Sequence, residues 1–121
     1  MSSNGTHNLE QGNRAYVAEF TQGDLALPPS QKYAVLTCMD ARIDPAAAFG
    51  IHTLVVVACS SLTCTGIPLG AAHVIRNAGA SARDAFRSLI ISQQLLGTTE
   101  VLLVKHTGCG TQLNKWRYDS S

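Results

Sequence analysis

Three short apolar runs separated by helix-like segments most constrain how this chain can fold. The runs cover residues 32–38, 72–76 and 100–105, and the first is apolar at nearly every position, as in strands buried on both faces. Between the second and third runs, apolar residues recur at helical spacing, at Ala85, Leu89, Ile90, Leu95 and Leu96. Strand, helix, strand, helix and strand in this order predict an α/β fold with a parallel sheet and flanking helices.

Local signals place the ends of the helices. Asp44-Pro45 reads as a helix start after the first strand, and Ser81 is a good N-cap with Asp84 three residues later. Gly97 terminates the helix that follows. A further helix is predicted over residues 8–20, whereas residues 1–7 lack periodicity and are predicted to be disordered.

Size, charge and cysteine content limit the class of protein. At 121 residues the chain has room for one core, and its formal charge of +1 disfavours nucleic acid or an anionic membrane as a partner. Neither a signal peptide nor an apolar stretch long enough to span a bilayer is evident, so a cytoplasmic location is expected. In a reducing cytosol, four cysteines suggest metal binding or catalysis more than disulfides.

Chemically active side chains follow two of the predicted strands. Cys38 ends the first strand, and His106 and Cys109 follow the third. If these strands are parallel neighbours, the three side chains converge on one point. Two thiolates and an imidazole form a zinc ligand set whose fourth position stays open, which is the catalytic arrangement. Such zinc would lower the pKa of a bound water to about 7, so that zinc-bound hydroxide exists at neutral pH.

Asp40 and Arg42 lie two residues apart on the extended segment after Cys38 and can form a charge-assisted pair. A carboxylate held in this way can accept a hydrogen bond from hydroxide on the metal, which gives the pair a catalytic role. Each residue also has a plainer interpretation. Cys38 alone suits a buried core, Asp40–Arg42 a surface ion pair, and the His106 to Cys109 segment a glycine-rich turn.

Three segments together resemble the β-class carbonic anhydrases. They are Cys38-Met39-Asp40-Ala41-Arg42, the stretch His73-Val74-Ile75-Arg76-Asn77-Ala78-Gly79, and His106-Thr107-Gly108-Cys109-Gly110. The resemblance implies the family's Rossmann-like three-layer fold and zinc at Cys38, His106 and Cys109. It also implies an Asp40–Arg42 catalytic dyad and reversible hydration of carbon dioxide to bicarbonate.

The same resemblance implies a homodimer or a higher homo-oligomer with a small-molecule substrate. The chain looks like the short-chain branch, whose related members hydrolyse carbonyl sulfide or carbon disulfide with the same ligands, so that hydrolysis is the alternative function. Arg76 and Asn77 could line the active-site cleft or hold a dimer interface, and the sequence does not separate these roles.

Two segments depart from the family pattern and define the expected domain organisation. Residues 51–66 read as an insertion flanked by two Gly-Ile dipeptides, and residues 111–121 read as an atypical tail that leaves the sheet incomplete at the C-terminus. The chain is therefore expected to comprise an N-terminal arm over residues 1–30 and a zinc-binding domain over residues 31–121. These departures also leave open a third interpretation, an inactive zinc-binding remnant.

Overall fold

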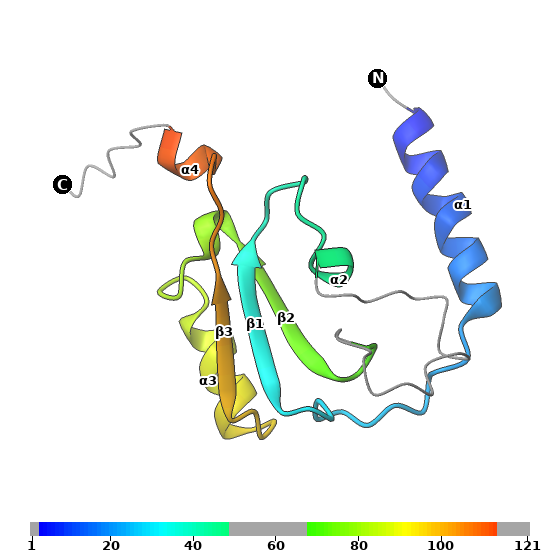
Figure 1. Ribbon diagram of the computed structural model, residues 1–121. Helices are drawn as coiled ribbons and strands as arrows, with labels where there is room; N and C mark the ends of the chain where they lie inside the picture. The colour runs from blue at the N-terminus through cyan, green and yellow to red at the C-terminus, as the bar shows by residue number, and fades with distance from the viewer. Residues whose placement is uncertain (1–2, 49–67, 114–121) are drawn as a thin grey trace.

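A computed structural model describes residues 3–48 and 68–113 of the protein. Three strands form its centre: β1 (Tyr33–Cys38), β2 (Ala72–Asn77) and β3 (Glu100–Val104) (Figure 1). The helices are α1 (Ser3–Glu19), α2 (Pro45–Ala48), the 3-10 helix η1 (Ala78–Ala80), α3 (Phe86–Gln94) and α4 (Gly110–Leu113). The predicted insertion, residues 51–66, and all but the start of the predicted tail lie outside the described residues.

The sheet has the order β2–β1–β3, and both pairs of strands are parallel. In the register, Cys38 of β1 lies beside Asn77 of β2, and Thr37 lies beside Val104 of β3. The carboxyl ends of all three strands therefore meet at one edge of the sheet. The predicted parallel α/β fold is confirmed, whereas the division into an arm and a domain at residue 30 stays a prediction.

The core lies on the two faces of the central strand β1. Val35 packs with Ala71 on one face, and Leu36 packs with Ala80 and Ala85 on the other. Because successive side chains of a strand point to opposite faces, the apolar run of β1 buries both sides at once. This double burial is what fixes β1 as the centre of the sheet and Cys38 as its buried tip.

Helix α3 covers only one face of the sheet, and its packed stripe is narrower than the sequence predicted. Ala85, just before the helix, and Ser92 are buried, and Leu89 between them packs against the core cluster that contains Leu36. Ile90 and Leu95 were expected on this face, but they are 41% and 75% exposed. Adjacent helical residues are about 100° apart, so with Leu89 directed at the sheet, Ile90 lies at the margin of the packed stripe.

Helix α1 begins at Ser3, so the prediction of disorder over residues 1–7 is wrong from Ser3 onward. The described side chains from residue 5 to residue 19 are all exposed, and the helix lies apart from the sheet (Figure 1). An exposed helix needs no apolar stripe, so the absence of periodicity gave no information about its first turns. No helix within the described ranges is both long and apolar enough to cross a membrane.

Two element boundaries also differ from the predictions. β1 starts at Tyr33 rather than at residue 32, because Lys32 adopts a left-handed backbone conformation with φ 56°. After Gly110, where no helix was legible, the chain forms the single turn α4. This short helix matters because it brings Thr111 to the edge of the sheet where the strands end.

Candidate metal centre

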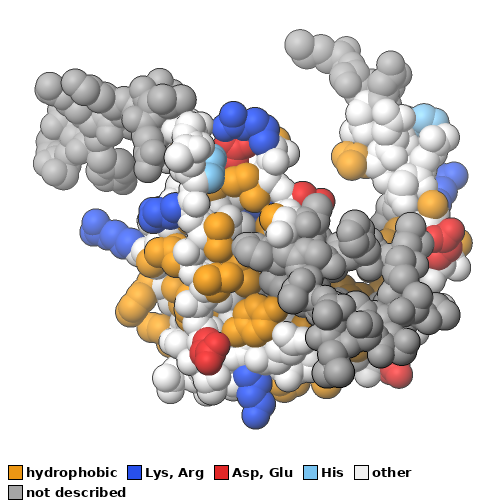
Figure 2. All heavy atoms as spheres, in the orientation of Figure 1, with side chains coloured by type: hydrophobic (Ala, Val, Ile, Leu, Met, Phe, Trp, Pro, Cys, Tyr) orange, Lys and Arg blue, Asp and Glu red, His pale blue; other side chains and the backbone are white. Residues whose placement is uncertain are grey.

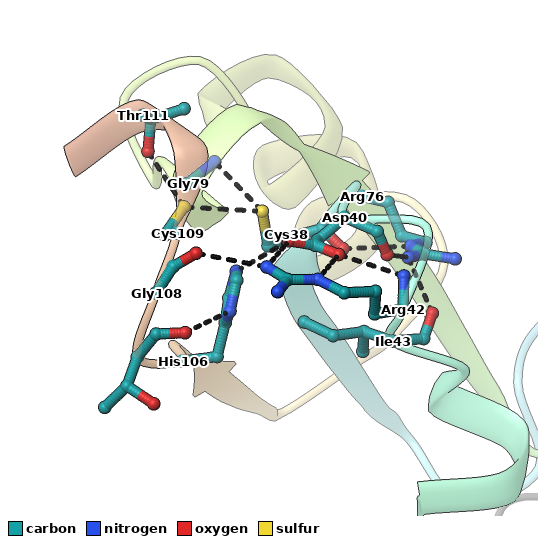
Figure 3. A network of polar contacts seen from close by, with 11 residues as sticks. Cys38, Asp40, Arg42, Ile43, Arg76, Gly79, His106, Gly108, Cys109 and Thr111 are labelled. Carbon is teal, nitrogen blue, oxygen red and sulfur yellow. Dashed lines mark hydrogen bonds and ion pairs between the residues drawn. The ribbon is translucent and has the colours of Figure 1, made fainter. Parts of the chain in front are cut away.

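Cys38, His106 and Cys109 come together at the carboxyl edge of the sheet (Figure 3). One ligand atom from each of the three residues lies within 4.8 Å of the others, and the two Sγ atoms are 3.8 Å apart. Both thiols are free, and both cysteines are only 3% exposed. The convergence predicted from the strand order is therefore present in the fold.

The hydrogen bonding of His106 leaves one ring nitrogen free to bind a cation. Nδ1 lies 2.9 Å from the carbonyl oxygen of Thr107, which can only accept, so Nδ1 carries the proton. Nε2 is buried and has no hydrogen-bond partner within the described part of the chain. Metal-binding histidines adopt this arrangement, in which a bond from one nitrogen fixes the tautomer and aims the other.

The donor set suits zinc in its chemistry as well as in its spacing. Thiolate and imidazole are the usual ligands of zinc, whereas magnesium and calcium prefer oxygen. Two sulfurs and one nitrogen supply three ligands of a tetrahedral set and leave the fourth for a water or a substrate. The buried, unpartnered Nε2 of His106 is the observation that favours a cation here over a simple turn.

The thiol of Cys38 is placed among backbone donors at the ends of β1 and β2. Hydrogen bonding from the backbone of Asp40, and from that of Gly79, lowers the pKa of Cys38, although burial opposes this. The Gly79 N–H donates to the Cys38 sulfur at 3.4 Å. A lowered pKa increases the thiolate population, which is the form that binds metals.

Asp40 and Arg42 form a two-pronged ion pair beside the ligand cluster (Figure 3). The Arg42 Nε donates to one carboxylate oxygen at 2.9 Å and an Nη to the other at 2.6 Å, while the Arg42 backbone N–H adds a third bond at 2.9 Å. These bonds hold the pKa of the Asp40 carboxyl well below its usual range, and the carboxylate in turn raises the pKa of Arg42.

The position of Asp40 distinguishes this pair from an ordinary surface ion pair. Its side chain is only 14% exposed, and one of its oxygens lies 4.0 Å from Nε2 of His106. Arg42 also donates to the carbonyl oxygen of Gly108 at 3.0 Å, which links the pair to the loop after β3. The carboxylate therefore faces the point where the three candidate ligands converge.

Arg76 has a role that sequence reasoning left open. Its guanidinium donates to three backbone carbonyls, those of Cys38, Asp40 and Ile43, at 3.1, 2.9 and 2.8 Å. It thereby fastens β2 to the whole segment that carries the first ligand and the ion pair. The neighbouring Asn77 exchanges two hydrogen bonds with the backbone of Ser81 and fixes the turn that contains Gly79.

His73 belongs to a separate polar network that the sequence did not reveal. Its Nδ1 lies 2.7 Å from the hydroxyl of Ser92, which lies 2.8 Å from the hydroxyl of Thr98. Ser92 and Thr98 are buried, so the chain of bonds ties β2 to α3 and to the turn after it. Ser92 carried no recognisable signal, because a single serine on a helix is usually exposed.

Two curated relatives share most of this chain. It is 43% identical to beta-carbonic anhydrase 1 of Mycobacterium tuberculosis over 99 residues, which are 81% of the chain and 50% of that protein. It is 39% identical to a carbon disulfide hydrolase of Acidithiobacillus thiooxidans over 77 residues, which are 63% of the chain and 31% of that protein. No protein-family model matches the sequence.

The fold also resembles a solved structure of a carbonic anhydrase from Glaciozyma antarctica. The TM-score is 0.70 with 45% sequence identity, over 90% of this chain and 56% of the other. The chain thus spans about half the length of the mycobacterial relative and of this structural neighbour.

Proposed function

Because the chain belongs to the β-carbonic anhydrase family, we propose that it binds zinc through Cys38, His106 and Cys109 and catalyses the reversible hydration of carbon dioxide to bicarbonate. One observation above all supports this proposal: the ligand atoms of three residues far apart in sequence lie within 4.8 Å of one another. A cluster of two buried thiols and a buried, unpartnered imidazole nitrogen has few other uses.

Zinc would supply Lewis-acid activation of water at this site. The protein's own contribution centres on Asp40, whose carboxylate stays ionised because Arg42 holds both of its oxygens. Oδ1 accepts two of the bonds from Arg42 and Oδ2 accepts only one, so Oδ2 keeps a lone pair with which Asp40 can accept a hydrogen bond from water or substrate. Arg42 thus orients Asp40. If the Asp40–Arg42 ion pair opened, the carboxylate could move toward the candidate ligands and close the open position, so the pair would act as a gate.

A second candidate function is hydrolysis of carbonyl sulfide or carbon disulfide at the same site. The 39% identity to a carbon disulfide hydrolase over 77 residues favours it. Carbon dioxide, carbonyl sulfide and carbon disulfide are all small, linear and electrophilic at carbon, so the three ligands and Asp40 would serve each of them. An inactive zinc-binding chain is the third candidate, and it is an outcome of the experiment below.

The experiment combines metal analysis with two activity assays on purified protein. We expect about one zinc per chain, and stopped-flow hydration of carbon dioxide faster than release of hydrogen sulfide from carbonyl sulfide or carbon disulfide. The reverse order of rates would favour the hydrolase, and zinc binding without either activity would identify the inactive chain. Folded protein with well under half a zinc per chain would refute the metal centre.

A substitution at one ligand tests the proposed set directly. Cys109→Ser should abolish stable zinc binding, because a neutral hydroxyl replaces a thiolate and only two ligands remain. Cys59→Ser, the same change at a cysteine outside the proposed set, is the matched control and should keep its zinc. Retention of zinc by Cys109→Ser would show that the third ligand is a different residue.

We infer that the protein is a homodimer or a higher homo-oligomer, supported by the exposed apolar residues Leu9, Tyr16 and Val17 of α1 and Phe20 just after it. Lone helices gain most of their stability by packing an apolar face, and a second copy would provide one. We also infer a cytoplasmic location, because two free thiols side by side persist best in a reducing compartment.

A further inference from the structure

Each of the two candidate thiolate ligands has its own hydrogen-bond donor. The Gly79 N–H points at the sulfur of Cys38 at 3.4 Å, and the hydroxyl of Thr111 lies 2.9 Å from the sulfur of Cys109 (Figure 3). A cysteine that binds a metal has lost its proton and can only accept. In the metal-bound state the Thr111 hydroxyl must therefore be the donor.

The two donor residues, Gly79 and Thr111, lie in close contact with each other. A Cβ atom on Gly79 would lie 2.8 Å from the hydroxyl oxygen of Thr111, closer than real Cβ contacts come. Gly79 also has φ +72°, which favours glycine for a second reason. The Lys105 ammonium donates to the Gly79 carbonyl at 3.0 Å and holds this turn against the end of β3. The absence of a side chain at Gly79 is what lets Thr111 approach Cys109.

Hydrogen bonds to the sulfurs offset the negative charge that two thiolates bring to a bound cation. Two thiolates carry two negative charges and cancel the charge of a divalent cation, which weakens its action as a Lewis acid. A hydrogen bond withdraws electron density from a sulfur, and bonds of this kind tune metal centres with thiolate ligands. One hydrogen bond to each sulfur would lower the electron donation of both thiolates to the cation.

We propose that Thr111 is a positioning residue of the metal centre, which orients the Cys109 thiolate and reduces its electron donation in concert with the Gly79 N–H. The proposal rests on the proposed zinc site and assigns to Thr111 a role in setting the acidity of the bound cation. Thr111 lies in the segment that the sequence predicted to be an atypical tail, so nothing in its pattern indicated this contact.

Cobalt(II) gives a direct spectroscopic test, because it can replace zinc and its thiolate complexes absorb in the near ultraviolet by sulfur-to-metal charge transfer. Thr111→Val keeps the shape of the side chain and removes the hydroxyl, so the Cys109 sulfur should become a stronger donor. We expect the charge-transfer band of Thr111→Val to move to longer wavelength. Thr111→Ser keeps a hydroxyl and should retain the position of the parent band. A purely structural role of Thr111 would not predict this difference between the two variants.

The possible results are separable. A parent protein that fails to bind cobalt or zinc would refute the proposed metal site itself. Cobalt bound by both proteins, with the same band in Thr111→Val as in the parent, would overturn the role of Thr111. If Thr111→Val does not fold, judged by circular dichroism, Thr111→Ala removes the same hydroxyl with a smaller side chain and decides the question in the same way.

Discussion

Asp40 illustrates how much one residue of the site depends on its immediate neighbours. Three hydrogen bonds from Arg42 fix its carboxylate, and a distance of 4.0 Å separates it from the free nitrogen of His106. The carboxylate contacts no candidate ligand by a hydrogen bond, so its loss should leave the ligands in place. Metal binding and turnover can therefore be separated by a change at this residue.

Asp40→Ala should keep about one zinc per chain and lose turnover by about 100-fold or more, the range for loss of a positioned proton acceptor. Zinc content and stopped-flow kinetics on the same preparation measure both effects. Asp24→Ala, which removes an exposed carboxylate from the loop before β1, is the control and should match the parent. An Asp40→Ala protein as active as the parent would rule out the proposed role of the carboxylate.

The segment between β1 and α2 depends on β2 for its shape. Residues 39–44 form no regular ladder with a neighbouring strand, and their carbonyl groups need other partners. Arg76 is a partner for two of them, since it reaches from β2 to the carbonyls of Asp40 and Ile43, and it also bonds the carbonyl of Cys38 at the end of β1. The geometry of the candidate metal centre is thus determined partly by a residue that has no hydrogen bond to any of the candidate ligand atoms.

Arg76→Met keeps most of the length of the side chain and removes all of its donors. We expect the free energy of unfolding to fall by about 1–3 kcal/mol, because three carbonyls lose a charged partner. Zinc affinity, measured by competition with a chelator, should fall as well. Arg87→Met, at an exposed arginine on α3, is the control. Equal stability and zinc affinity in the two variants would contradict the positioning role of Arg76.

On the scale of the whole molecule, one face of the sheet has little cover among the described residues. Val74 and Leu102, which flank Val35 on the face opposite α3, are 43% and 47% exposed. Figure 2 shows apolar side chains gathered over this region of the sheet. Together with the exposed helix α1, this surface favours association with further polypeptide over a lone monomer.

The assembly can be tested through α1. Val17→Asp places a charge at an apolar position that is 64% exposed, so it should lower the mass measured by analytical ultracentrifugation without changing zinc content. Asn13→Asp introduces the same charge at a polar position of the same helix and should leave the mass unchanged. A parent protein that is already monomeric at high concentration would refute the inferred oligomer.

The parallel sheet and the set of residues at its edge could be predicted from local sequence patterns alone. The apolar run of β1 must bury both of its faces, and parallel strands necessarily end on the same side, so Cys38, His106 and Cys109 could be predicted to converge. The pairing of Asp40 with Arg42 also followed from local spacing, because residues two apart on an extended segment point the same way.

The groups that surround these residues become apparent only in the assembled fold. The clamp made by Arg76, the network from His73 through Ser92 to Thr98, and the donor pair at Gly79 and Thr111 each join segments distant in sequence. No local pattern encodes such contacts, because a single donor side chain has no periodicity and finds its acceptor only when the strands and turns are assembled. Local patterns gave the candidate ligands, and the assembled fold gave the hydrogen bonds that orient them.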